Sequence, residues 1–460
     1  MRKITFWLSL VLIFVMPWEN IVEIDGLGTL SRAIGLMVAV LWLATVAITG
    51  RFRGLHPFHA AVFLFVLWKV ASVFWSVSVD VTVGSLQTYL QLFFLVLILW
   101  DLYTTQEALT AGLQTYVLGA YVSVASIVKN QVTGNTALYE RFSATGFQVD
   151  DIGVILALGI PVAWYLATSE RYKKSLYALK MLNYAYVPIA LLGIALTGTR
   201  TALVAAMPAL LYGMGTLNRI RLAGRVAIFV ALVAALFVVQ SYVPQSSFDR
   251  LSTTGESISD NDLNGRVNIW RYGVATFMEH PLIGIGSGAF RSAEERKVAH
   301  NTYLSILVEE GIVGFIIFGA ILAIAFAQVL RQPKWEARFW ITVLVVWALG
   351  AFTLTWEPRK QTWLFLSMAV ISANLSERRE DADEPAAQPV MAGGREPRTM
   401  LTIRAARADT GSRPSSTYWL AGAAPHAVEP PGPPRVVEQP GPRADAPRAY
   451  PRSFLIVKRQ

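Results

Sequence analysis

The sequence predicts an all-α polytopic membrane protein, and three observations support this fold class: the composition, the long apolar segments and the placement of basic residues. Hydrophobic residues make up 54% of the 460-residue chain and charged residues only 15%, against about 25% charged in soluble proteins. Apolar runs long enough to cross a bilayer, which takes roughly 20 residues, alternate with short polar connections. The runs are continuous and do not alternate residue by residue, so they predict helices and not strands.

About twelve segments have this character. They lie near residues 4–17, 30–49, 58–77, 84–102, 108–128, 151–168, 183–198, 200–215, 224–242, 303–330, 338–355 and 362–375. The first resembles a signal peptide in length, but Met16-Pro17-Trp18-Glu19 offers no small-residue cleavage pattern, so we predict that it is a span.

The basic connections predict the orientation. With the N-terminus inside, alternate connections are basic and the others are acidic or neutral, as the positive-inside rule requires. The basic inner positions are Arg51, Arg53, Arg171, Lys173, Lys174, Lys180, Arg219, Arg221, Arg225, Arg331, Lys334, Arg338, Arg378 and Arg379. The inner connection near Asp101 is the exception, because it has no basic residue. Both termini are therefore expected in the cytoplasm.

This topology places residues 243–302 outside as the one long loop, and loops of that length are usually functional. Apolar residues at helical spacing over 268–278 predict a short interfacial helix, followed by a turn at 284–288. The membrane domain is expected to cover residues 1–375. From 376 to 460 the chain is rich in Pro and Arg, which predicts a disordered cytoplasmic tail.

Composition also excludes several classes of function. The chain has no cysteine, which rules out disulfides, thiolate metal sites and cysteine nucleophiles. The net charge of +9 does not indicate nucleic acid binding, because the basic residues lie beside spans and in the tail without interleaved aromatic residues. Membrane lipid is the expected partner of these charges.

Three arginines in two places along the chain are candidates for an anion site. Arg200 lies where a span begins, and a guanidinium there is either a phosphate clamp or an interfacial anchor that snorkels. Arg266 and Arg271 belong to the segment 265–271, just ahead of the predicted interfacial helix, where they either face an outer cavity or belong to a solvated surface helix.

The segment from His300 to Gly314 closes the long loop. His300 lies at the junction of loop and membrane, where a histidine is either a general base or a structural hydrogen-bonding group. Glu309 and Glu310 enter an apolar run, which is costly unless they are paired or face water. No cluster of metal ligands is predicted, since His280 is isolated from His300 in the sequence.

These motifs together resemble the O-antigen ligase and polymerase superfamily. The resemblance rests on three motifs over about residues 190–330: Gly265-Arg266 with Trp270, His280-Pro281-Leu282-Ile283-Gly284-Ile285-Gly286, and His300-Asn301-Thr302-Tyr303-Leu304 with Glu310-Gly311-Ile312-Val313-Gly314.

The resemblance implies a metal-independent, cofactor-free glycosyltransferase of the bacterial inner membrane. It would take a glycan from a polyprenyl diphosphate carrier on the outer face and pass it to a hydroxyl of another glycan, of the lipid A core or of a protein. It implies that Arg200 and Arg266 bind the diphosphate and that His300 activates the acceptor. The further predicted substrate contacts are Arg271, Asn301, Tyr303 and Glu310.

Two other functions fit the sequence less closely. A transporter or flippase could use buried charges such as Lys69 and Glu309 as a pathway, but no pair of similar halves is apparent. A scaffold of a polysaccharide export machinery would use the tail to bind partners.

Overall fold

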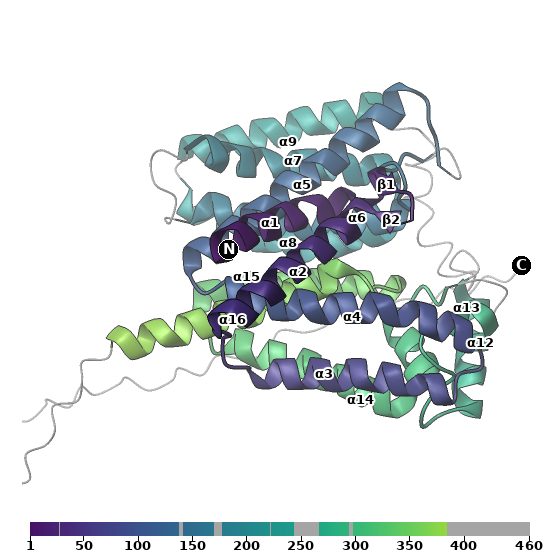
Figure 1. Ribbon diagram of the computed structural model, residues 1–460. Helices are drawn as coiled ribbons and strands as arrows, with labels where there is room; N and C mark the ends of the chain where they lie inside the picture. The colour runs from purple at the N-terminus through teal and green to yellow at the C-terminus, as the bar shows by residue number, and fades with distance from the viewer. Residues whose placement is uncertain are drawn as a thin grey trace, which may run out of the picture. The chain divides into compact units, whose positions relative to one another are not determined.

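The protein is a bundle of long helices (Figure 1). The computed structural model describes residues 1–383 except 27, 138–140, 170–176, 221, 243–265 and 294–297, and these residues belong to one compact unit. Each predicted span overlaps a helix. The helices are α1 (Arg2–Val15), α2 (Leu30–Thr49), α3 (Pro57–Ala71), α4 (Val79–Leu102), α5 (Gln106–Val132), α6 (Val149–Thr168), α7 (Tyr177–Thr197), α8 (Arg200–Gly215), α9 (Leu222–Tyr242), α14 (Thr302–Leu330), α15 (Lys334–Thr353) and α16 (Lys360–Asp383).

Among the described residues, nine of these helices are long and apolar enough to cross a membrane, where α1 is counted with the 3-10 turn that follows it to Ile21 and α3 with the one that follows it to Phe74. The all-α polytopic fold class is therefore confirmed. The other three, α8, α9 and α16, lie at predicted spans but do not reach the same length or hydropathy over their described residues. Helix α16 also continues to Asp383, past the predicted end of the membrane domain at residue 375. The predicted disordered tail from residue 384 onward lies outside the described residues.

Short elements fill the connections. They are η1 (Met16–Ile21), β1 (Glu23–Ile24), β2 (Gly28–Thr29), η2 (Ser72–Phe74), η5 (Leu217–Arg219), α12 (Arg266–Glu279) and α13 (Phe290–Ala293). The two strands pair antiparallel in the α1–α2 connection, with Glu23 opposite Thr29, and were not predicted. Helix α12 confirms a helix at the predicted place in the long loop, and the turn expected at 284–288 is also present.

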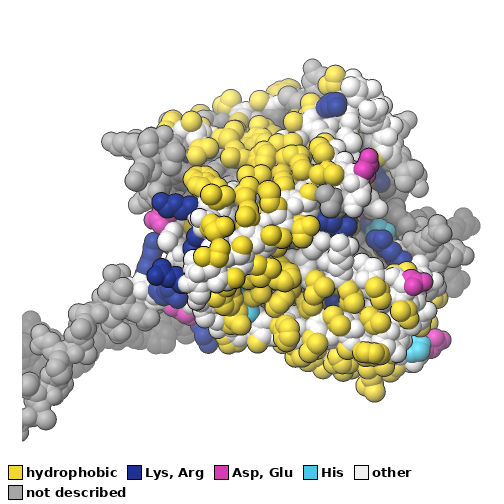
Figure 2. All heavy atoms as spheres, viewed as in Figure 1, with side chains coloured by type: hydrophobic (Ala, Val, Ile, Leu, Met, Phe, Trp, Pro, Cys, Tyr) yellow, Lys and Arg dark blue, Asp and Glu magenta, His cyan; other side chains and the backbone are white. Residues whose placement is uncertain are grey.

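The surface is apolar between two charged zones. Hydrophobic side chains cover the middle of the face in Figure 2, while charged side chains gather toward its two sides. Exposed large apolar residues include Trp7, Leu36, Phe63 and Ile316. Helix α6 is the most enclosed, and all of its window of highest hydropathy is buried. A broad apolar surface of this kind suits lipid contact.

The connections predicted to share a side of the membrane also lie together. Asp101, at the end of α4, pairs with Arg2 at 2.9 Å and accepts a hydrogen bond from the backbone N–H of Arg53 at 3.0 Å. His56, before α3, contacts Gln328 near the end of α14 at 2.9 Å. The inner connection near Asp101 lacks a basic residue of its own. Arg2 and Arg53, from other parts of the chain at the same end of the bundle, supply the basic partners of Asp101.

Candidate functional site

The turn from Pro281 to Gly288 is joined to a break in α14. In an unbroken helix the N–H groups of residues 312 and 313 would bond to the carbonyls of residues 308 and 309. Here the N–H of Ile312 bonds to the carbonyl of Pro281 at 2.9 Å, and the carbonyl of Glu309 accepts from the N–H of Gly286 at 2.9 Å. The turn therefore satisfies the backbone groups that the break frees.

Two glycines make this close approach possible. Gly311 has φ 66° and ψ −170°, a conformation almost confined to glycine. A Cβ on Gly311 would lie 2.3 Å from the carbonyl oxygen of Leu282, and one on Gly284 would lie 2.4 Å from that of Glu309. Gly284 of the second motif and Gly311 of the third motif thus allow two backbone segments to touch.

A helix cap and a hydrogen bond from α12 position the segment before α14. Asn301 caps α14, and its side-chain oxygen accepts from the N–H groups of Tyr303 and Leu304 at 3.0 and 3.1 Å. The carbonyl of Ala299 accepts from the indole of Trp270 in α12 at 3.0 Å. Between them His300 adopts a positive φ of 47°, which no other non-glycine residue of the described chain does. The histidine is thereby held in one place.

His300 lines a cavity of about 410 Å³ between α4, α6, α14 and the α15–α16 connection. The charged and hydroxyl-bearing residues that line it include Ser85, Thr88, Tyr89, Asp151, Arg291, Ser305, Glu309, Glu357 and Arg359. Such a mixture of buried charge and open volume suits a polar substrate.

Two adjacent aspartates at the start of α6 position the arginines around this cavity. Asp150 accepts a hydrogen bond from Arg266 of α12 at 2.8 Å and lies 3.5 Å from Arg141. Asp151 pairs with Arg359 and accepts from the indole of Trp356 at 2.8 Å. Arg266 and Arg359 thus come from distant parts of the chain to neighbouring carboxylates.

The surroundings of His300 lower its pKa below the usual 6.5. Burial is the main cause and the positive charge of Arg266 adds to it, while Asp150 and Asp151 act in the opposite direction. A lowered pKa leaves the imidazole neutral near pH 7, and a neutral imidazole can accept a proton.

Arg200 lies at the same end of the bundle as Arg266. It is the first residue of α8, and the hydroxyl of Thr199, just before it, lies 3.4 Å from Asp150. Arg200 is half-buried and does not line the His300 cavity. Arg271 is exposed on α12.

The other predicted contacts also lie beside the cavity without lining it. Tyr303 is half-buried, and its hydroxyl lies 3.5 Å from the carbonyl of Ala348 in α15. Glu310 is fully buried in an ion pair of 2.9 Å with Lys69 of α3. Substrate contact by Arg271, Asn301, Tyr303 and Glu310 stays a prediction.

The ion pair of Lys69 belongs to a larger buried cluster. Lys69 also lies 3.6 Å from Glu357, which accepts from the hydroxyl of Tyr89 at 2.8 Å. Glu309 accepts from the N–H of Gly288 at 2.8 Å and reaches the cavity. Lys69, which a transporter could have used as part of its pathway, is therefore paired, and its ion pair with Glu310 links α3 to α14.

Several of these residues were not found from the sequence. Asp150, Asp151, Glu357 and Arg359 were not singled out. The signal was present for the aspartates, because two consecutive carboxylates at the start of an apolar helix need partners. Nothing in the sequence pointed to Arg359, which follows Pro358 in a short connection.

Comparison with known proteins supports the resemblance. The O-Antigen ligase family matches residues 185–319, which include Arg200, α12, the 281–288 turn and most of α14. This match supports a place for the chain in the O-antigen ligase and polymerase superfamily. The chain is also similar to the "Exopolysaccharide production protein ExoQ" of Rhizobium meliloti (strain 1021), which is 23% identical over 65% of this chain and 72% of the relative. Together with the apolar helices, the two similarities support a membrane protein of surface-polysaccharide biosynthesis.

Proposed function

We propose that this protein is a glycosyltransferase that moves a glycan from a polyprenyl diphosphate to an acceptor hydroxyl, without a metal ion. The observation that carries the proposal is the place of His300 in a polar cavity, where burial and the positive charge of Arg266 lower its pKa. The reaction would occur on the outer face of the bacterial inner membrane, with both termini in the cytoplasm.

The proposed step exchanges one bond for another. The acceptor oxygen forms a bond to the anomeric carbon as the bond from that carbon to the diphosphate oxygen breaks. The electron pair of the broken bond goes to the diphosphate, and the acceptor proton goes to a ring nitrogen of His300. The diphosphate is already a good leaving group and needs charge stabilisation more than protonation.

Arg266 and Arg200 are proposed to supply that stabilisation. A guanidinium offers two parallel N–H donors that match phosphate oxygens. Asp150 fixes Arg266 before substrate binds, so little reorganisation is needed when charge develops. Of the described residues, no three His, Asp or Glu side chains are grouped so that they could hold a metal ion, and metal independence stays a prediction.

The buried charges favour this proposal over transport. A transport pathway needs charges that substrates can reach, yet of the two candidate charges Lys69 is fully buried in its ion pair with Glu310, and Glu309 reaches the His300 cavity. The proposed acceptor is a glycan, the lipid A core or another hydroxyl, and a polysaccharide export machinery is a possible partner class.

A test uses the purified protein in nanodiscs with lipid-linked glycan extracted from a strain that lacks this gene. The proposal expects glycan transfer and release of polyprenyl diphosphate. Movement of the lipid-linked glycan across the membrane with its linkage intact would contradict it. In the deletion strain, lipid A without glycan would indicate a ligase, and single-repeat glycan a polymerase.

A further inference from the structure

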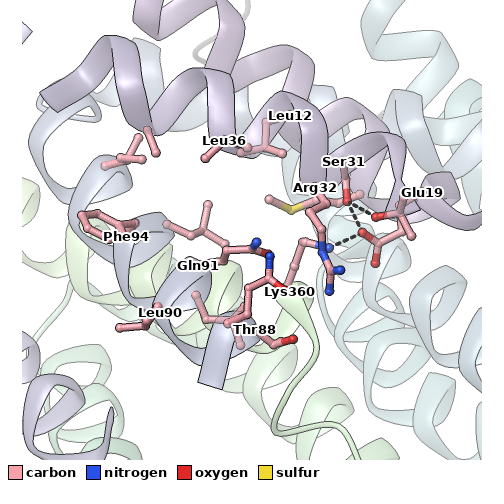
Figure 3. A pocket seen from close by; sticks show the side chains of 18 of the residues that line it. Leu12, Glu19, Ser31, Arg32, Leu36, Thr88, Leu90, Gln91, Phe94 and Lys360 are labelled. Atoms are coloured by element: carbon pink, nitrogen blue, oxygen red, sulfur yellow. Dashed lines mark hydrogen bonds and ion pairs between the residues drawn. The ribbon is translucent and has the colours of Figure 1, made fainter. Parts of the chain in front are cut away.

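A second, apolar pocket adjoins the His300 cavity and is not used by the mechanism above. Its volume is about 480 Å³, and it lies between α1, α2, α4 and residues 358–360 (Figure 3). Thr88, Pro358 and Arg359 line both this pocket and the His300 cavity. The two spaces therefore meet at one wall.

One face of α2 forms the long side of this pocket. Arg32, Leu36, Val40 and Leu43 line it at spacings of four, four and three residues, which place them on the same side of a helix. At 1.5 Å per residue this face runs roughly 16 Å along the helix. Leu36 and Val40 are 55% and 58% exposed, so the pocket opens sideways at the apolar surface.

The charges of the pocket gather at one end. Lys360 pairs with Glu19, which also accepts a hydrogen bond from Ser31. Arg32 points into the pocket beside Lys360 (Figure 3). Within the part of the chain that the structure describes, Arg32 is half-buried and has no hydrogen-bond or ion-pair partner. An apolar groove that ends at an unpaired arginine suits a lipid chain with an anionic head.

The position of the charged end of the pocket favours a lipid-linked glycan over a bilayer phospholipid. Arg32 begins α2 on the same side of the bundle as His300, and Arg359 separates the two spaces. A glycan attached to the anionic head could therefore extend past Thr88 and Arg359 into the His300 cavity. A bilayer phospholipid would use the groove but not the opening toward His300.

We propose that this pocket binds a second lipid-linked glycan, the acceptor, with its isoprenoid chain along Leu36 and Val40 and its diphosphate at Arg32 and Lys360. The inference rests on the proposed function, in which Arg266 and Arg200 hold the donor diphosphate. Two lipid-linked substrates would then approach His300 from different sides. The reaction class is polymerisation, in which each transfer extends the glycan on the acceptor.

The kinetic test varies acceptor and donor separately in nanodiscs. Arg32→Gln removes the charge, and Val40→Trp fills the groove. Each is expected to raise the KM for the lipid-linked acceptor about 10-fold or more, as for loss of a charged hydrogen bond, with little change in kcat or donor KM. The matched controls are Arg51→Gln, at the far end of α2, and Val204→Trp, an exposed valine of α8 outside the pocket; both should behave as wild type.

A binding test needs no catalysis. Undecaprenyl diphosphate with a diazirine on its chain and no glycan is photo-crosslinked to the protein, and the labelled peptides are mapped. The site is supported if α2 and α4 are labelled in the wild type and the labelling decreases in Arg32→Gln. This result supports the site even if the protein transfers no glycan. A lack of transfer would then count only against the proposed function.

Three results would overturn the site. The first is unchanged acceptor KM in both variants of an active enzyme. The second is a raised KM for the donor alone. The third is equal competition for labelling by phosphatidylglycerol, which would show a pocket for bilayer lipid.

Discussion

Arg266 donates a 2.8 Å hydrogen bond to Asp150, although 116 residues separate them in the sequence. This contact ties the helix of the long loop to the start of α6. The next residue, Asp151, pairs with Arg359, and both residues line the His300 cavity. Two consecutive carboxylates therefore position two arginines from different connections, and the account of catalysis depends on that placement.

Asp150→Asn should lower the transfer rate. The amide keeps the size of the side chain but loses the charge that fixes Arg266, and loss of one charged hydrogen bond corresponds to about 10-fold or more. Initial rates of glycan transfer in nanodiscs measure the effect. Asp25→Asn, at an exposed site, is the control and should leave the rate unchanged. Equal rates in the two variants would argue against a positioning role.

Arg200→Gln and Arg266→Gln should each cost roughly 10²- to 10³-fold in kcat, by analogy with loss of one donor to a developing negative charge. Single-turnover rates with saturating donor separate this loss from weaker binding. Arg51→Gln, at the opposite end of the bundle, should retain activity. A loss confined to the KM of the donor would limit both arginines to ground-state binding.

The pH dependence should report His300. The imidazole acts as a base only when neutral, and its pKa lies below 6.5, so activity should persist from pH 7.5 to below 6.5 and fall at lower pH. Asp150→Asn removes a charge that raises this pKa, so its acid limb should move to still lower pH. Profiles of kcat/KM measure both. An acid limb above pH 6.5 in the wild type would contradict the assignment.

Gly311→Ala should destabilise the fold. The conformation of Gly311 costs a non-glycine residue on the order of 1–3 kcal/mol, and the added Cβ would also meet the carbonyl of Leu282. Thermal unfolding in detergent measures the change. Gly319→Ala in the same helix is the matched control, because nothing lies within 4 Å of its Cβ. Equal melting temperatures would refute the need for this break in α14.

Lys69→Met should be strongly destabilising, by about 3–5 kcal/mol, because it leaves buried carboxylates without their cation. Lys129→Met, an exposed lysine of α5, should have little effect. Adding Glu310→Gln to Lys69→Met should recover part of the loss. If the double variant is no more stable than the single one, the cluster is not held by this pairing.

The fold was largely predictable because the bilayer imposes a simple requirement. Apolar runs of span length must be helical, so each predicted span overlaps a helix and the ends of α2 match at Leu30–Thr49. Local rules also predicted α12. They could not predict the break at Gly311 or the β1–β2 pair, since both depend on contacts between backbone segments.

The site was predictable only where a motif marked it. His300 and Arg266 stood out because they lie in the one long outer loop, and they lie close enough for Arg266 to affect the pKa of His300. Asp150 and Arg359 lie far from those motifs in sequence. The role of Asp150 depends on the contact between α6 and α12, and that of Arg359 on the contact between α6 and the α15–α16 connection. Glu310, a predicted substrate contact, also forms a buried ion pair with Lys69, which spacing alone does not indicate.

The most direct test of the central claim is a single-turnover assay of His300→Ala in nanodiscs with lipid-linked glycan. The account predicts that the variant inserts and melts like the wild type, still binds the lipid-linked donor, and transfers glycan at least about 10²-fold more slowly, as for loss of a general base. Transfer at the wild-type rate by His300→Ala would contradict it.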